Sequence, residues 1–437
     1  MSKTIEFQER AKRCIPGLTQ LLSKRPDRFT LGVWPTYYSR AKGCEVWDLD
    51  GNRYIDMSIS GIGACVLGYA DPDVDEAVIA AIRNGVASSL NSPEEVLLAE
   101  KLCELHPWAD MARFTRAGGE AMAVAVRIAR AHTDRDVVAF CGYHGWHDWY
   151  LAANVGTENA LGEHLIPGLK PKGVPHGLKG TALPFRYNRI EELEAIVASH
   201  GDRLAAIVME PIRSEEPKPG FFGKVRALAD RCGAVLILDE ISAGFRFACG
   251  GSHLALFDER PDMAVFSKAL GNGYPISAII GREDVMQSSQ DSFISSTNWT
   301  ERTGFAAALA LIEKHRANRV HERLCALGDA VTAGWRRSAE RRGIDLHVGG
   351  LSPFPHFVVE GADFPVLKAL FIQEMLQRGY LTSNLYYAMY AHTDGHVEQY
   401  LEAADSVFGV LADAIRRNDA ADRIKGQPAI SGFGRLA

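Results

Sequence analysis

Three absences narrow the classes to which this chain of 437 residues can belong. No stretch approaches the roughly 20 consecutive apolar residues that a membrane-spanning helix needs, and the charged segment 1–17 has no apolar core of the kind found in secretion signals. No block of five or more lysines and arginines occurs, and the net charge is −6. We therefore expect a cytoplasmic protein that binds neither nucleic acid nor membranes, and whose partners are small molecules or proteins.

Cysteine is present but follows no paired pattern. No C-x-x-C pair occurs, which argues against a zinc ribbon and against a disulfide framework. The cysteines are expected to be reduced thiols that mostly fill the core. They are Cys14, Cys44, Cys65, Cys103, Cys141, Cys232, Cys249 and Cys325.

What the sequence does contain is an alternation of short apolar runs and helical patterns between about residues 110 and 285. Several runs are apolar throughout, which is typical of strands that are covered by helices on both faces. The pattern predicts an α/β fold with a mostly parallel sheet. The predicted strands are "DVVAFCG", "LAAIVMEP", "GAVLILDE", "DMAVFSK" and "ISAIIG".

A second, smaller α/β domain is predicted from the two ends of the chain. Segments 45–48 and 54–57 alternate around the turn 50–52 as a β-hairpin does. Amphipathic helices are predicted within 319–343 and 400–418, around the strands "IDLHVGG" and "FPHFVVEG". The expected division is 1–65 as an N-terminal segment of the small domain, 66–315 as the large domain and 316–437 as the C-terminal small domain.

Chemically active side chains follow the predicted strands at the point where each strand ends. Lys268 closes "VFSK", Asp239 and Glu240 close "LILDE", Glu210 closes "VMEP", and Tyr143 and His144 follow "VVAFCG". Because the carboxyl ends of parallel strands meet at one edge of a sheet, these side chains are expected to lie together.

A phosphate site is predicted from "TRAGGEAMAVAVRIARA", where Gly118 and Gly119 directly precede a helix. Free backbone amides at a helix N-terminus bind phosphate without a cationic side chain. A phosphate site, a lysine, a carboxylate and a stacking aromatic residue together suit pyridoxal 5′-phosphate. Lys268 would form a Schiff base with its aldehyde, and Asp239 would keep the pyridine nitrogen protonated.

Five motifs carry a family resemblance, in order along the chain: "RAKGCEVWDLDGNRYIDM", "AGGEAMAVAVRIAR", "GYHG", "LDEISAGFR" and "FSKALGNGYPISAIIG". Together they resemble the class III, fold-type I, pyridoxal-phosphate-dependent aminotransferases. The resemblance runs from about Tyr37 to the segment "AHTDGHVEQYLEAADSVF", which is nearly the whole chain. The "AHTDGHV" segment and the form of the lysine loop are closer to the glutamate-1-semialdehyde aminomutase branch.

The resemblance implies roles for single residues. Lys268 would be the Schiff-base lysine and Asp239 the partner of the ring nitrogen. Tyr143 would stack on the cofactor, with His144 packed near it, and Gly118 and Gly119 would bind phosphate. Thr297, in "SSTNWTERTG", matches the family threonine that reaches the phosphate of the neighbouring subunit, so a homodimer with shared active sites is implied.

Some positions depart from the family pattern. Ala117-Gly118-Gly119-Glu120 lacks the two hydroxyls of the usual phosphate loop, and "TNWTERTG" replaces the usual Leu-Ser-Gly-Asn-Pro stretch. Glu301 and Arg302 within it are expected to pair with the backbone or with each other. Arg213 is a candidate for binding a substrate carboxylate, and Glu215 stands where some members carry a glutamate that gates such an arginine.

Several alternatives stay open. Transamination from an amine to an aldehyde or ketone ranks first, followed by an intramolecular aminomutase, a decarboxylase or a racemase on the same fold. A scaffold that has lost catalysis and acts as a binding protein is the alternative from another class. His144 and His147 in "YHGWHDW" form an H-x-x-H pair without a third ligand, so no metal site is predicted and His147 is expected to be structural.

Overall fold

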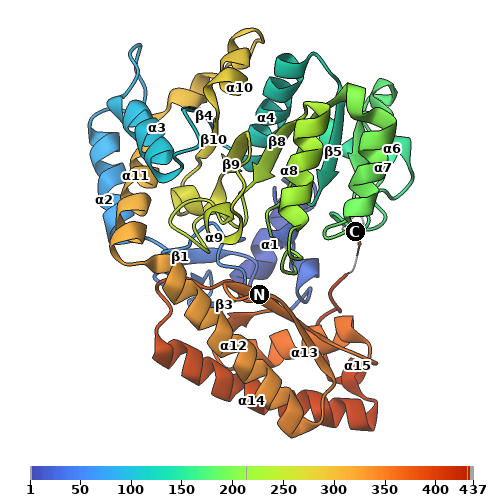
Figure 1. The fold of residues 1–437 in the computed structure, drawn as a ribbon. Helices are drawn as coiled ribbons and strands as arrows, with labels where there is room; N and C mark the ends of the chain where they lie inside the picture. The colour runs from blue at the N-terminus through green and yellow to red at the C-terminus, as the bar shows by residue number, and fades with distance from the viewer. Residues whose placement is uncertain (1, 213, 431, 434–437) are drawn as a thin grey trace. The chain divides into compact units, whose positions relative to one another are not determined.

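The computed structural model describes residues 2–212, 214–430 and 432–433, and the chain divides into two compact units (Figure 1). The central unit comprises Pro72–His321. The terminal unit combines the two ends of the chain, Met1–Asp71 and Glu322–Ala437.

Seven strands of the central unit form one sheet within the described residues, in the order β4-β10-β9-β8-β7-β5-β6. The run β9-β8-β7-β5-β6 is parallel, and β10 is antiparallel to both of its neighbours. The mostly parallel sheet is therefore confirmed. The strands are β4 (Met111–Thr115), β5 (Val137–Cys141), β6 (Ala182–Pro184), β7 (Leu204–Met209), β8 (Val235–Asp239), β9 (Met263–Phe266) and β10 (Ser277–Gly281).

Burial explains which strands the sequence revealed. All residues of β5, β7, β8, β9 and β10 are buried, and all five strands were predicted. The two unpredicted strands, β4 and β6, are only partly buried and lie at the two edges of the sheet. An edge strand needs no continuous apolar run, because one side of it is not covered by another strand.

Helices cover both faces of this sheet. Alternate strand residues such as Val208 and Ile237 share a buried cluster with helix α4 (Gly118–Thr133), whereas α8 (Phe221–Cys232) contacts β7 and β8 without belonging to that cluster. The period of two along a strand sends neighbouring side chains to opposite faces. The other helices of this unit are α2 (Pro72–Arg83), α3 (Pro93–Leu105), α5 (Asp148–Leu151), α6 (Ala153–Gly156), α7 (Ile190–His200), α9 (His253–Leu256), α10 (Glu283–Gln287) and α11 (Arg302–Ala317).

The terminal unit joins the N-terminal hairpin to the C-terminal part of the chain. Strands β2 (Glu45–Asp48) and β3 (Arg53–Met57) form the predicted hairpin, and β3 pairs in parallel with β13 (Tyr380–Thr382). Strand β1 (Tyr38–Lys42) completes this sheet. The unit also contains the hairpin of β11 (Leu346–Leu351) and β12 (Phe354–Val359), and the helices α1 (Lys3–Cys14), α12 (Val320–Arg342, whose first two residues belong to the central unit), α13 (Phe364–Leu376), α14 (Asp394–Arg417) and α15 (Ala420–Arg423).

The cysteines are all free thiols, but the expectation that they mostly fill the core was too strong. Cys44 and Cys141 are buried, Cys14 is exposed, and the others are half-buried. Among the described residues, no helix has both the length and the apolar character needed to cross a bilayer.

Candidate active site

The predicted site residues of the central unit gather at the carboxyl edge of its sheet. Asp239 ends β8, and Lys268 follows the end of the neighbouring strand β9 by two residues. Tyr143 and His144 follow the end of β5 in the same way. Strands β8 and β9 are paired with Asp239 opposite Val265. The segments that follow the two strands therefore begin at the same height along the sheet. Parallel strands thus bring together residues that are far apart in sequence.

Lys268 is held in an unusual backbone conformation. Its φ of 44° lies in the left-handed region, and it begins the 3-10 helix η5 (Lys268–Gly271). A left-handed conformation costs a residue with a Cβ atom about 1 kcal/mol or more, and such strain concentrates at functional sites. Burial lowers the pKa of the Lys268 amine, and the carboxylates of Glu210 and Asp239 oppose that shift. A lowered pKa raises the fraction of free amine, which is the form that attacks carbonyl groups.

Asp239 is buried and oriented from two sides. Its Oδ1 accepts the backbone N–H of Ile241 at 3.0 Å, and its Oδ2 lies 2.8 Å from Nδ1 of His144. The Nε2 of His144 lies 3.1 Å from the carbonyl oxygen of Cys141, so both ring nitrogens of His144 have a polar partner. His144 thus packs against Asp239, and its place near the cofactor stays a prediction.

Tyr143 presents a partly exposed ring at the same edge, with 39% of its surface accessible. Its backbone N–H donates to Oε2 of Glu210 at 3.0 Å, so Glu210 supports the turn that carries the ring. The turn needs a glycine before Tyr143, because Gly142 has a φ of 117° and a Cβ there would meet Glu210 Oε2 at 2.5 Å. An aromatic ring fixed in this way is suited to packing against a flat cofactor.

Gly118 and Gly119 begin helix α4 as the sequence predicted. The carboxylate of Glu120 accepts the backbone N–H of Arg116 at 2.9 Å, but the N–H groups of the two glycines have no acceptor among the described residues. A Cβ on Gly118 would meet Ile241 at 2.9 Å, so the missing side chain lets the loop after β8 approach the helix start. Two free amides at a helix N-terminus fit a phosphate group. His147 supports this turn, since its Nδ1 lies 3.2 Å from the Gly119 carbonyl oxygen.

Thr297 lies at the start of the 3-10 helix η7 (Thr297–Thr300) and is exposed on the central unit. Arg116, which precedes the phosphate loop, ties the same segment down by donating to the carbonyl oxygens of Asn298 at 2.6 Å and Trp299 at 3.1 Å. Arg116 therefore fixes the segment that carries Thr297 to the start of helix α4 of the same chain.

Glu301 and Arg302 were expected to pair with the backbone or with each other, and only the backbone pairing of Glu301 is confirmed. Arg302 makes a two-bond ion pair with Glu94, at 2.9 and 2.6 Å. Glu301 instead caps helix α11 by accepting the N–H of Thr303 at 2.9 Å. The sequence separation of 208 residues between Glu94 and Arg302 hides such a pair from any local pattern.

Glu240 turns away from the predicted site. Its two oxygens accept the backbone N–H and hydroxyl of Ser252 and the backbone N–H and Nδ1–H of His253, at 2.6 to 3.0 Å. Trp108 donates to Nε2 of His253 at 3.0 Å, which fixes the proton of that ring on Nδ1. Glu240 therefore clamps the loop that follows β8 and has little capacity left for a ligand.

A cavity of about 490 Å³ adjoins Glu210 at this edge. Arg213, the candidate for a substrate carboxylate, lies outside the described residues, while Glu215 is exposed and lines the cavity. The loop around them is held by Asn188, which donates to the Glu216 carbonyl oxygen at 2.9 Å and accepts the Lys218 N–H at 2.8 Å. The lining of this cavity includes Glu210 but not Lys268, Asp239 or Tyr143.

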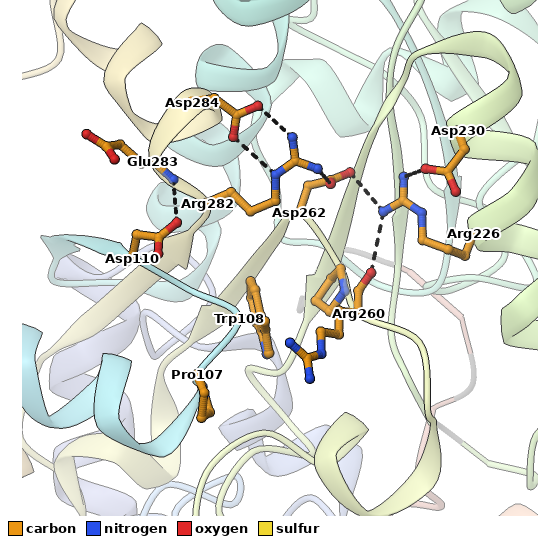
Figure 2. Close-up of a pocket in the computed structure, with 11 residues that line it drawn as sticks. Pro107, Trp108, Asp110, Arg226, Asp230, Arg260, Asp262, Arg282, Glu283 and Asp284 are labelled. Carbon is orange, nitrogen blue, oxygen red and sulfur yellow. Dashed lines mark hydrogen bonds and ion pairs between the residues drawn. The ribbon is translucent and has the colours of Figure 1, made fainter.

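A larger cavity, of about 650 Å³, lies at the opposite edge of the sheet, where β9 begins (Figure 2). Figure 2 shows that its charged residues pair with one another: Arg282 joins Asp262 and Asp284, and Arg226 joins Asp262 and Asp230. It is separate from the amine, carboxylate and amides described above. No group of three or more metal-ligating side chains occurs among the described residues.

Ser242 is the site residue that the sequence analysis missed. Its Oγ accepts a hydrogen bond of 2.7 Å from the Lys268 amine. The signal is the strand register, which the structure supplies: Ser242 lies three residues beyond Asp239, and Lys268 lies three beyond Val265, the strand partner of Asp239.

Comparison with known proteins agrees with the chemistry of this edge. A sequence model of the family described as "Aminotransferase class-III" matches residues 31–347. A 3-aminobutyryl-CoA aminotransferase of Cloacimonas acidaminovorans (strain Evry) is 32% identical, with 92% of this chain and 96% of the relative covered. A glutamate-1-semialdehyde 2,1-aminomutase of Syntrophobacter fumaroxidans (strain DSM 10017 / MPOB) is also 32% identical, with the same coverage.

A solved structure shows the same fold. The FumI protein of Sphingopyxis sp. MTA144, in its pyridoxal-phosphate-bound internal aldimine form, aligns with a TM-score of 0.85 at 27% identity and covers 98% of both chains. The predicted fold type I, with a large sheet domain and a smaller α/β domain, is thus confirmed. The free amides of the helix start, the buried Asp239 and the Lys268 amine, whose pKa is lowered by burial, fit the phosphate, the ring nitrogen and the aldehyde of this cofactor. The chain belongs to the class-III aminotransferases and is a pyridoxal-phosphate-dependent enzyme of amino-group transfer.

Proposed function

We propose that Lys268 captures the aldehyde of pyridoxal phosphate and afterwards carries the proton that moves during amino transfer. One observation supports this most strongly. The half-buried Lys268 amine, whose pKa is lowered, lies beside the buried carboxylate of Asp239, which ends the neighbouring strand. When bound, the cofactor supplies an aldehyde that takes up amines and a ring that stabilises negative charge on the adjoining carbon.

The chain's own residues divide the remaining tasks. Gly118 and Gly119 would hold the phosphate through their amides, and Tyr143 would lie against the ring. Asp239 would keep a proton on the ring nitrogen, and His144 would orient Asp239 through its contact with Oδ2. Lys268, once its amine is free, would remove a proton from one carbon and return it to another.

The reaction proposed for this site is transfer of an amino group from an amine donor to an aldehyde or ketone acceptor. The Cloacimonas relative is named for a substrate whose amino group stands on the third carbon of an acyl thioester. We therefore include 3-amino acids and their thioesters among the donors to be tested. The cavity beside Glu210 gives such a substrate room to extend away from the amine.

An intramolecular aminomutase is the second candidate, and one observation favours it. The aminomutase of Syntrophobacter fumaroxidans is as similar to this chain as the aminotransferase is, at 32% identity. A mutase keeps the amino group on one carbon skeleton, so it needs no separate donor and releases no keto product. Decarboxylation and racemisation use the same lysine and rank lower.

We further propose a homodimer with shared active sites, in which Thr297 reaches the phosphate held by the neighbouring subunit. Thr297 is exposed, as this role requires. The central unit also exposes large apolar side chains, which a second copy would cover: Ile82, Leu90, Val96, Leu97, Trp146 and Phe293.

We retain the division into domains 1–65, 66–315 and 316–437 as a proposal. Free thiols support a reducing compartment such as the cytoplasm.

The test is a set of half-reactions with the pyridoxal-phosphate-loaded protein. Candidate donors are added one at a time, the visible absorbance is followed, and the carbonyl product is identified by mass spectrometry. We expect one class of amine to bleach the band and to yield one equivalent of carbonyl product, with Lys268→Ala inactive. Lys224→Ala, on the exposed surface of α8, is the matched control and should keep full activity. Turnover of an amino-aldehyde without any carbonyl release would instead assign the mutase.

A further inference from the structure

The hydroxyl of Ser242 is the one hydrogen-bond acceptor that the Lys268 amine reaches among the described residues. The distance of 2.7 Å lies at the short end for an N–H···O bond, where charge-assisted bonds are found. Ser242 is half-buried, like Lys268. The contact therefore occurs where water competes less than it does on an open surface.

The fold fixes this contact through two neighbouring strands. Ser242 and Lys268 lie at the same offset beyond the paired residues Asp239 and Val265, so the two segments leave the sheet side by side. The turn that carries Ser242 is held at both ends, because the Ile241 N–H donates to Asp239 and the Gly244 N–H donates to the carbonyl oxygen of Glu240. On the other strand, the backbone of Lys268 is held in the left-handed conformation, with a φ of 44°, from which its side chain reaches Ser242.

We propose that Ser242 is a positioning residue that holds the Lys268 amine at the carboxyl edge of the sheet whenever the amine is not joined to the cofactor. This inference rests on the proposed role of Lys268. A hydroxyl suits the task because it accepts from an ammonium group and donates to a neutral amine. The amine can therefore gain or lose a proton without leaving its partner. A backbone carbonyl or a carboxylate can only accept, so it could not donate to the neutral amine.

The test measures the amine directly in the full-length chain after removal of the cofactor. Lys268 is acetylated by trace reagent over a range of pH, and its modification is quantified by peptide mass spectrometry to give the pKa of its amine. In Ser242→Ala both forms of the amine lose their partner, but the charge-assisted bond of the ammonium form is the stronger one, so we expect the pKa of Lys268 to fall by about one unit. Ser242→Thr keeps the hydroxyl and should restore the value.

Two further variants make the test specific. Ser242→Cys keeps a similar volume with a weaker acceptor, and it should give a smaller fall in the same direction. Ser267→Ala is the matched control, since the hydroxyl of Ser267 donates to the Ile276 carbonyl oxygen at 3.3 Å although the residue adjoins Lys268. It should leave the pKa of Lys268 unchanged.

An unchanged or raised pKa in Ser242→Ala would overturn the proposal, as would an equal fall in Ser267→Ala. The readout requires neither cofactor nor turnover. Failure of the proposed function, seen as amino transfer that survives in Lys268→Ala, is therefore distinguishable from failure of this inference.

Discussion

Asp239 and Glu240 are consecutive carboxylates at the end of β8, each in contact with a histidine, and the structure uses them in opposite ways. Glu240 is 1% exposed and receives four hydrogen bonds from Ser252 and His253. Asp239 is 2% exposed and receives two, from Ile241 and His144. Because a carboxylate accepts about four hydrogen bonds, Glu240 is saturated by the protein while Asp239 can still accept from a ligand.

The pleat of the strand separates the two residues. Val235 and Ile237 belong to the buried cluster that contains α4, and the period of two places Asp239 on that same face, where α4 begins with its two glycines. Glu240 belongs to the other face and meets the loop that contains Ser252. Asp239 and Glu240 are thus similarly buried and each contacts a histidine, yet their roles differ. What distinguishes them is the number of hydrogen-bond donors that the protein supplies to each carboxylate.

The largest effect is predicted for Asp239→Asn. An amide cannot hold a positive charge on the ring nitrogen, so we expect kcat/KM to fall about 1,000-fold, or roughly 4 kcal/mol of transition-state stabilisation. The free energy of unfolding should fall less than in Glu240→Gln, since the amide oxygen can still accept from Ile241 and the new NH₂ group would face only Nδ1 of His144. Steady-state kinetics with the best donor measure the loss, and the exposed Asp258→Asn is the control. A loss smaller than tenfold would show that Asp239 is not the partner of the ring nitrogen.

A smaller effect, on stability, is predicted for Glu240→Gln. The new NH₂ group would face donors from Ser252 and His253, so the free energy of unfolding at pH 7 should fall by about 2 to 4 kcal/mol. Chemical denaturation measures it, with the exposed Glu216→Gln as control. Activity per folded molecule should change much less than in Asp239→Asn.

The pH dependence of this stability loss sharpens the comparison. Burial alone would raise the pKa of Glu240, but hydrogen bonds from His253 and Ser252 outweigh it and lower the pKa. A lowered folded-state pKa contributes stability that is complete above the unfolded value, about 4.3, and is lost as pH falls through the folded value. The gap between wild type and Glu240→Gln should therefore narrow below about pH 4. If the difference in unfolding free energy between wild type and Glu240→Gln stayed constant down to pH 3, Glu240 would not be ionised in the folded protein.

The sequence predicted the parts of the site that depend on strand ends. Lys268 and Asp239 follow fully apolar runs, and such runs mark buried parallel strands, so their convergence could be expected before the structure was known. The direction of the Glu240 side chain could not be predicted, because it depends on a loop twelve residues further along the chain. Arg302 was assigned the wrong partner for the same reason. Ser242 required the register of β8 against β9, which a single sequence does not provide.

The central claim is that the amine of Lys268, and no other amine of the chain, takes the cofactor's aldehyde. Borohydride reduction of the pyridoxal-phosphate-loaded protein makes that linkage permanent, and peptide mass spectrometry then locates it. The account predicts the modification at Lys268, in the segment "FSKALGNGYP", in wild type and in Asp239→Asn, and no specific modification in Lys268→Ala. Specific labelling of a different lysine in wild type would contradict the account.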